Sequence, residues 1–139
     1  MAQGRGSFPA LEPGSDMPFE LRVTSGEPLA RLRGWGSDDY ASTQEALERI
    51  ASDPRLAPGQ PVLFDLRELE YLATPPEVAS FASDAMPRLY SGRRVALVAR
   101  RGTQQGICRA FATKATQAGA RVEVFVEPDL AAAWLESAE

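Results

Sequence analysis

Apolar and polar residues alternate from Phe19 to Thr24, which places the apolar residues on one side and the polar residues on the other. Strict alternation is typical of a β-strand that buries one face. Residues 25–28 contain Gly and Pro and predict a turn. Residues 29–35 show a weaker strand pattern, so the two strands are expected to form a hairpin. The residues expected to face inward are Phe19, Leu21, Val23, Ala30, Leu32 and Gly34.

Farther along the chain, short apolar runs alternate with segments whose apolar residues recur every three or four positions. Continuous apolar runs are typical of strands covered on both faces, and the longer spacing indicates amphipathic helices. Strands are expected at 61–66, 94–100 and 121–126, and helices at about 38–52, 74–89, 103–119 and after 127–129. The inward residues expected on the last two helices are Ile107, Ala110, Phe111, Ala115, Leu130, Trp134 and Leu135.

The predicted order is therefore β-β-α-β-α-β-α-β-α. Strands that alternate with helices favour a parallel sheet, and the opening hairpin adds one antiparallel pair. The fold class is α/β, with a single-layer, mixed, mostly parallel sheet, an N-terminal hairpin and four helices. The domain is expected to span 17–137. Residues 1–16 are rich in Gly, Pro, Ser and Ala and are expected to form a disordered tail.

The segment from Pro61 to Glu77 contains the strongest local signals. Its apolar strand is expected to stop at Asp65. Thr74 at the N-cap, Pro75 at the first helical position and Glu77 two positions later then predict a capping box. Thirteen residues after the cap, Pro87 is expected to kink or end this second helix early.

The start of the first helix is a second place where acidic residues occur together. Ser37 and Asp38 are suitable N-caps. Asp38 and Asp39 are therefore interpreted as helix caps rather than as a catalytic or metal-binding pair.

Composition narrows the chemistry that is available. The chain has 139 residues, enough for one domain, a formal net charge of −4, and no histidine. Without histidine, the commonest general base and the commonest metal ligand are both missing. The single cysteine, Cys108, excludes an intrachain disulfide and is expected to be a small buried apolar residue. The mild acidity gives no indication of nucleic-acid binding. No metal site or cofactor is expected.

The expected location is the cytoplasm. No apolar run approaches the roughly 20 residues that a membrane-spanning helix needs. The first 16 residues lack the continuous apolar core of a secretory signal.

Several strings resemble the SpoIIAA-like branch of the STAS / SEC14-like superfamily over about residues 17–137. The central strand ends in Asp-Leu, the third helix opens on Gly-Ile-Cys-Arg-Ala, and the last helix has an Ala-x-x-Trp-Leu pattern. Asp53-Pro54-Arg55 before the central strand is also similar to the family. These strings are 63–66, 106–110, Phe125 with 130–135, and 53–55.

The resemblance implies a domain that is not an enzyme and that binds a protein or a small ligand in regulation. The partner implied is a regulatory kinase or an anti-sigma-like protein. In the anti-sigma-antagonist members a hydroxyl at the start of the helix after the central strand is phosphorylated, and that position falls on Thr74. The family pattern has an acidic residue before the hydroxyl and a small residue after it, where this chain has Ala73 and Pro75. The interpretation favoured here is a helix cap, with phosphorylation as the alternative.

Two candidate surfaces follow from these elements. The partner-binding surface expected around the second helix start comprises Tyr71, Leu72, Pro75, Pro76 and Glu77, with Tyr71 and Leu72 exposed. The anion-binding candidate comprises Arg100, Arg101 and Thr103, because a strand end there meets a helix N-terminus. Its alternative is a solvated basic turn.

The outer side of the hairpin is expected to carry Arg22, Arg31 and Arg33, with Glu20 available for cross-strand ion pairs. Trp35 is interpreted as a cover for the edge of the core, with an exposed partner anchor as the alternative.

The first hypothesis is thus a non-enzymatic regulatory module that binds a protein partner. The alternative is a carrier or sensor for an apolar or anionic small molecule in a cavity under the helices. A deep apolar pocket would favour the ligand, whereas a filled core with exposed Tyr71 and Leu72 would favour the partner.

Overall fold

A computed structural model describes residues 19–90 and 92–137 of the chain, and the predicted tail at 1–16 lies outside these described residues. The five predicted strands are present, and the predicted helices appear with one of them divided. The strands are β1 Phe19–Arg22, β2 Ala30–Gly36, β3 Val62–Leu69, β4 Arg94–Val98 and β5 Arg121–Phe125. The helices are α1 Tyr40–Ala51, α2 Pro75–Ser80, the π-helix η2 Phe81–Ala85, α3 Met86–Tyr90, α4 Thr103–Gln117 and α5 Pro128–Glu136.

The strands form one sheet in the order β1-β2-β3-β4-β5, which is also their order in the chain. β1 pairs antiparallel with β2, as the predicted hairpin requires, and the remaining pairs are parallel. The mixed, mostly parallel α/β fold predicted from the sequence is therefore confirmed. Phe19 stands opposite Gly34 across the hairpin, and a Cβ atom at Gly34 would lie 2.8 Å from the Phe19 ring.

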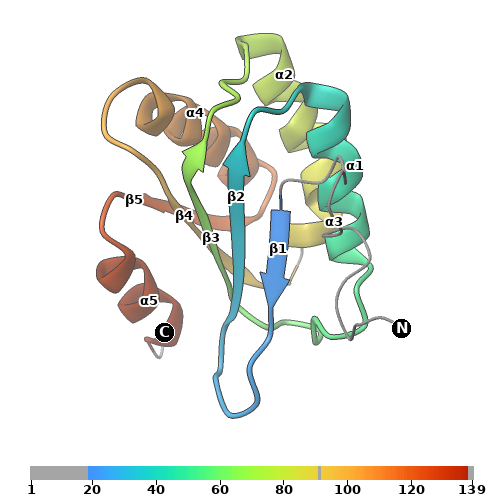
Figure 1. Cartoon of the computed structure of the whole chain (residues 1–139), viewed down its shortest axis with the longest axis vertical. Coiled ribbons are helices and arrows are strands. Elements are labelled where there is room, and N and C mark those ends of the chain that lie inside the picture. The colour runs from blue at the N-terminus through green and yellow to red at the C-terminus, as the bar shows by residue number, and fades with distance from the viewer. Residues whose placement is uncertain (1–18, 91, 138–139) are drawn as a thin grey trace.

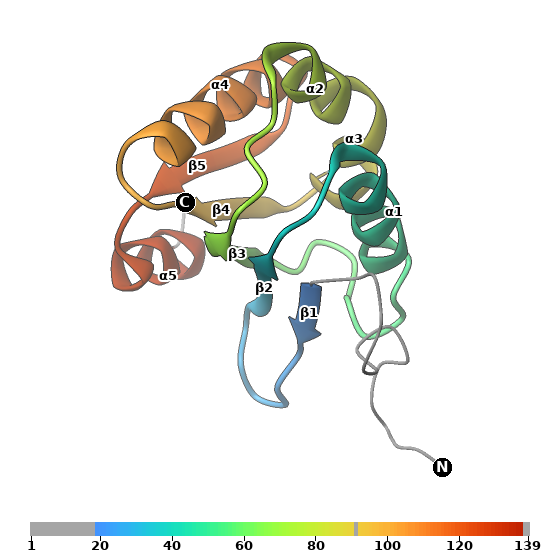
Figure 2. The same ribbon diagram turned by 45° about the horizontal axis from the view of Figure 1, so that its top comes forward.

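The helices are divided unequally between the two faces of the sheet. Figures 1 and 2 show α1, α2, α3 and α4 on one face and α5 alone on the other. The larger apolar cluster lies under the first four helices. The smaller cluster joins α5 to the opposite face, and its buried residues are Leu29, Leu63, Ala96, Val98, Ala131 and Leu135.

β3 does not stop at Asp65 as predicted but continues to Leu69. Beside β4 the pairing ends at Asp65, which is opposite Val98. Beside β2 it continues to Leu69 after a register shift between Arg33 and Trp35. The end of β3 is therefore a two-stranded extension of the sheet, and a run of apolar residues alone does not reveal it.

The second predicted helix is divided into α2, η2 and α3. The chain stays helical through Pro87, so the proline does not end the helix at its own position, as one form of the prediction had it. The irregularity is the π-helix at Phe81–Ala85, before the proline. Pro87 follows this π-helix directly, as the second residue of α3.

The starts and faces of the other helices differ in detail from the prediction. Asp39, rather than Ser37 or Asp38, is the N-cap of α1, because its Oδ1 accepts a 2.9 Å hydrogen bond from the Ser42 N–H. On α4, Ala110 is exposed and not inward. On α5, Leu130 is 60% exposed, whereas Ala131 and Leu135 are buried.

Candidate functional site

An apolar pocket of about 100 Å³ lies between the sheet and the helices that cover its larger core. Its floor comes from β3 and β4, and its walls come from the helices and from the segment that follows β3. A cavity under the helices is the feature that the small-molecule hypothesis requires. The lining residues are Thr43, Leu47, Phe64, Leu66, Leu69, Tyr71, Leu72, Ala73, Val78, Phe81, Tyr90, Leu97, Gln104, Ile107, Cys108 and Phe111.

The segment between β3 and α2 forms one wall of this pocket. Leu72 is 42% exposed, as predicted. Tyr71 is half-buried, so the prediction of an exposed Tyr-Leu pair is wrong for Tyr71. Its ring packs edge-on against Phe81 with 6.5 Å between centroids, and its hydroxyl donates a 2.7 Å hydrogen bond to Glu77 Oε1. These two contacts hold the tyrosine against the pocket rather than in solvent.

The predicted capping box at the start of α2 is confirmed. The Thr74 N–H donates to Glu77 Oε1 over 3.0 Å, and the Glu77 N–H donates to Thr74 Oγ1 over 3.4 Å. Glu77 Oε1 thus receives hydrogen bonds from Thr74 and Tyr71, which together lower the pKa of the Glu77 carboxyl. The helix cap and the pocket wall share one carboxylate. Of the predicted partner surface, Pro75 and Pro76 are exposed beside it.

Most polar groups around the pocket already have partners within the protein. Gln104 Oε1 accepts from the Arg100 N–H over 2.6 Å, and its Nε2 donates to the carbonyls of Leu66 and Leu69 over 2.7 and 3.2 Å. The Thr43 hydroxyl donates to Asp38 Oδ2 over 2.5 Å. These groups tie the pocket walls together and leave an almost wholly apolar surface for an occupant.

Cys108 lines the pocket and is buried, as predicted. Burial raises the pKa of its thiol to about 12. The thiol is therefore protonated near neutral pH and is a poor nucleophile, because the reactive form of cysteine is the thiolate.

The three predicted anion-binding residues have different surroundings, and one of them already bonds to the protein backbone. The Arg100 guanidinium donates to the backbone carbonyls of Arg67 and Leu69 at the end of β3. Arg101 is exposed, and Thr103 is the exposed first residue of α4. The strand order never reverses, so the crevice in which such sheets usually hold ligands does not form here. Anion binding at this turn stays a prediction.

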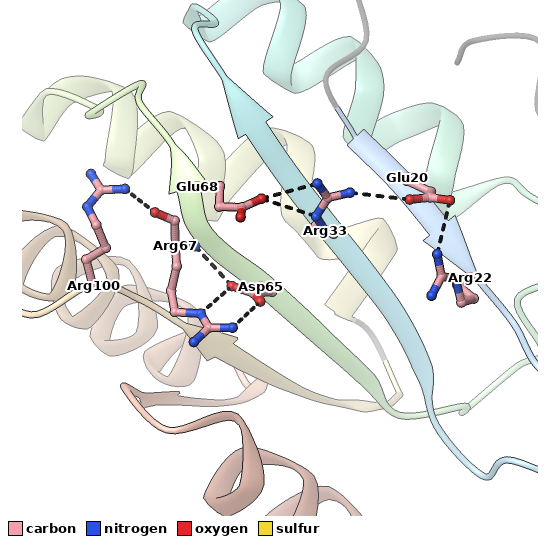
Figure 3. A network of polar contacts seen from close by, with 7 residues as sticks. All are labelled: Glu20, Arg22, Arg33, Asp65, Arg67, Glu68 and Arg100. Atoms are coloured by element: carbon pink, nitrogen blue, oxygen red, sulfur yellow. Dashed lines mark hydrogen bonds and ion pairs between the residues drawn. The ribbon is translucent and has the colours of Figure 1, made fainter. Parts of the chain in front are cut away.

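The face of the sheet opposite the four helices carries a row of charged side chains on β1, β2 and β3, shown in Figure 3. Glu20 lies 3.5 Å from Arg22 on its own strand and 3.5 Å from Arg33 on β2, so the predicted cross-strand ion pair is present for Arg33, whereas Arg31 pairs with Glu27. Arg33 also pairs with Glu68 at 3.2 Å and lies over the Trp35 ring at 4.7 Å. Exposed pairs of this kind stabilise a fold little, by roughly 0–1 kcal/mol each. Trp35 is half-buried.

A second hollow, a groove of about 290 Å³, lies between α2 and α4. Ala110 is exposed because it lines this groove and does not face the core. Three residues, Ala73, Val78 and Ile107, line both the groove and the pocket. The full lining of the groove is Ala73, Pro75, Val78, Thr103, Gly106, Ile107, Ala110 and Lys114.

Sequence reasoning found Tyr71, Leu72 and the α2 cap but missed Tyr90 and Gln104. Gln104 offers a weak signal, because it is a polar residue one turn before the buried Cys108 on the inner face of a helix. Tyr90 lies at the end of α3, where the π-helix before it changes the helix phase that its sequence position would indicate.

The described residues contain neither a cluster of metal ligands nor a helix that could cross a membrane. Within 19–90 and 92–137, no group of three acidic or cysteine side chains is placed to hold a metal ion. No helix in the same ranges combines the length and apolar character that a membrane crossing requires.

Comparison with known proteins identifies the fold. No protein-family model and no curated protein matches the sequence. Among solved structures, the chain is similar to an uncharacterized protein of the DUF3478 family from Shewanella loihica PV-4, which has a SpoIIAA-like fold. The TM-score is 0.53 at 15% identity, over 84% of this chain and 91% of that chain. The protein described here is therefore an α/β domain with a SpoIIAA-like fold, as its sequence predicted.

Proposed function

We propose that this domain is a non-enzymatic binding module that holds a small apolar molecule in the pocket between its helices and its sheet, as a carrier or a sensor. The observation that supports this function is the pocket itself. Ligand sites in proteins are concave and mostly apolar, with a few polar groups. An engineered apolar cavity of about 150 Å³ binds benzene, so the cavity of about 100 Å³ seen here suits a compact occupant.

The lining argues for an uncharged ligand over an anionic one. No lysine or arginine is among the described residues that line the pocket, so a buried carboxylate or phosphate would find no counter-charge among them. Burial of an unpaired charge is far more costly than burial of apolar surface. The protonated Cys108 thiol and the lack of histidine in the chain also argue against catalysis at this site.

Thermal denaturation and two-dimensional NMR in the presence of small neutral hydrocarbons test the proposal. We expect apolar probes to raise the melting temperature and to shift resonances of pocket residues. At a probe concentration one hundred times its dissociation constant the stabilisation is about 2.7 kcal/mol. Benzoate, which adds a charge to a similar ring, should bind much more weakly.

A matched pair of variants locates the effect. Cys108→Leu adds bulk inside the pocket and should abolish probe binding, whereas Ala133→Leu adds similar bulk to the exposed side of α5 and should leave binding intact. Circular dichroism confirms that both variants are folded. Binding that survives equally in both variants, or no binding to the wild type at all, would contradict the proposal.

A second candidate function, regulatory binding of a protein partner, is supported by the exposure of Leu72 beside the groove between α2 and α4. Phosphorylation of Thr74 belongs to this candidate, because Thr74 is exposed at the helix N-terminus, where a phosphate is electrostatically favoured. Peptide mapping of protein purified from its native host tests the modification. A fully unmodified Thr74 across growth conditions would remove this part of the candidate.

A further inference from the structure

One polar group in the pocket lacks the internal partner that its neighbours have. Tyr90 lines the pocket and is only 2% exposed, and its ring packs edge-on against Phe111 with 5.3 Å between centroids. Yet its hydroxyl forms no hydrogen bond with any residue in the described part of the chain. The hydroxyls of Thr43 and Tyr71, by contrast, donate to Asp38 and Glu77.

The free hydroxyl borders open space. Among the described residues, Arg93 Nε is the buried polar side-chain atom that has neither a hydrogen-bond partner nor accessible surface. The Tyr90 oxygen has no partner but is not sealed in this way, so some of its surface remains accessible. Because Tyr90 is otherwise enclosed, the pocket that it lines is the open space beside it.

An unpaired polar group at such a place is costly. An occupant that fills the pocket without offering an acceptor would remove this donor from water and give it no hydrogen bond in return. Burial of the ring raises the pKa of the Tyr90 hydroxyl well above its usual value, so the group is a neutral donor. The neighbouring Cys108 thiol is also protonated, which leaves no buried negative charge here.

We propose that the Tyr90 hydroxyl is the polar recognition group of the pocket and donates a hydrogen bond to a single neutral acceptor, such as a carbonyl or ether oxygen, on an otherwise apolar ligand. This inference rests on the proposed function and specifies its ligand class. The aromatic side chains of the pocket lining, Phe64, Phe81 and Phe111, suit a flat or cyclic apolar body. A pure hydrocarbon would leave the hydroxyl unpaired, and an anion would lack a counter-charge.

The test uses cyclopentanone and methylenecyclopentane, which are no larger than benzene in heavy-atom count and have nearly the same shape, but differ in that a carbonyl oxygen replaces a methylene group. NMR titration gives the dissociation constant of each probe for the wild type, Tyr90→Phe and Tyr71→Phe. The quantity compared is the ratio of the two affinities, because the difference in water solubility between the probes then cancels among the proteins.

We expect the ratio in favour of cyclopentanone to fall about tenfold in Tyr90→Phe, the effect of one buried hydrogen bond. It should stay unchanged in Tyr71→Phe, whose lost hydroxyl was already bonded to Glu77. The ligand-free Tyr90→Phe protein should melt at the wild-type temperature or above it, since an unpaired hydroxyl is removed.

The possible outcomes separate the two proposals. If both probes bind and the ratio is the same in all three proteins, the hydroxyl has no role in recognition and this inference is overturned, while the apolar pocket function stands. An equal fall in both variants also overturns it. If neither probe binds the wild type in the pocket, the proposed function fails and the inference fails with it.

Discussion

At the start of α2, the carboxylate of Glu77 connects two parts of the molecule that a sequence pattern treats separately. It accepts a hydrogen bond from the N–H of Thr74, which caps the start of the helix, and one from the hydroxyl of Tyr71, which belongs to the pocket wall. The capping box could be predicted because it depends on residues three positions apart. The contact with Tyr71 could not, since it depends on how the segment after β3 folds back.

Replacement of Thr74 by alanine removes the side-chain oxygen that accepts the Glu77 N–H. We expect Thr74→Ala to lower the free energy of unfolding by about 1 kcal/mol, the usual effect of losing an N-cap. Urea denaturation monitored by circular dichroism measures this change. Thr74→Ser keeps the oxygen and should retain most of the stability, so an equal loss in both variants would argue against a capping role.

The Asp53 carboxylate accepts three hydrogen bonds from Arg55, one from the backbone N–H and two from the guanidinium, at 2.9 to 3.1 Å. The bond to the Arg55 side chain is the main reason that the pKa of Asp53 is lowered in the folded protein. Unfolded aspartate has a pKa of about 3.9. The ionised carboxylate therefore contributes stability above about pH 4, and this contribution is lost as the pH falls through the lower, folded-state pKa.

We accordingly expect Asp53→Asn to be less stable than the wild type at pH 7 and to lose less stability on acidification. Urea titrations at several values from pH 7 down to pH 3 measure both effects. In the Arg55→Gln background the substitution of Asp53 should matter much less. Parallel pH profiles for wild type and Asp53→Asn would show that the pair does not contribute in this way.

At the scale of the elements, α5 shows how far an apolar pattern determines a helix face. Leu130, Ala131, Trp134 and Leu135 are all apolar, so two different faces are compatible with the sequence. In the structure the buried pair is Ala131 and Leu135, four residues apart, whereas Leu130 is 60% exposed. The packing of α5 against β3 and β4 selects between these faces, and the helix sequence by itself does not.

This assignment predicts different effects for two leucines in one helix. Leu135→Ala should lower the free energy of unfolding by about 2–4 kcal/mol, because it opens a cavity in the smaller core. Leu130→Ala should change it by no more than about 0.5 kcal/mol, as is usual for an exposed site. Chemical denaturation of both variants measures the contrast. Similar losses would mean that the helix is rotated relative to this structure.

The same reasoning explains which parts of the fold and site were predictable. The hairpin followed from strict alternation, and the α2 start followed from a local cap. The extension of β3 to Leu69 depends on its pairing with β2, and the exposure of Ala110 depends on how α4 lies beside α2. The pocket is a gap among side chains from several elements, so no single segment of the sequence indicates it.

At the scale of the whole molecule, the two faces of the sheet are stabilised by very different amounts of buried apolar surface. Four helices and most of the core lie on one face, and a single helix with a small cluster lies on the other (Figures 1 and 2). A unit with few buried apolar contacts can open without unfolding the rest. The side that contains the pocket is therefore the more persistent part of the molecule.

Native-state hydrogen exchange tests this difference. We expect amides in the last two turns of α5 to exchange with a lower opening free energy than those in β3 and β4, which lie between the two layers. The exchange of α5 should also depend little on urea concentration, as for a local opening. Equal protection in α5 and β3 would indicate a single cooperative unit instead.

The strand order described above also bears on how the chain reaches its fold during synthesis. The sheet runs from β1 to β5 in the order in which the strands leave the ribosome. The strand that each new strand pairs with has therefore already been synthesised. Among the five described strands, none has to be inserted between two others, and contacts between strands adjacent in sequence keep the loop-closure cost moderate. The sheet can thus assemble strand by strand from the N-terminal hairpin outward, and α5 packs last on a sheet that is already assembled.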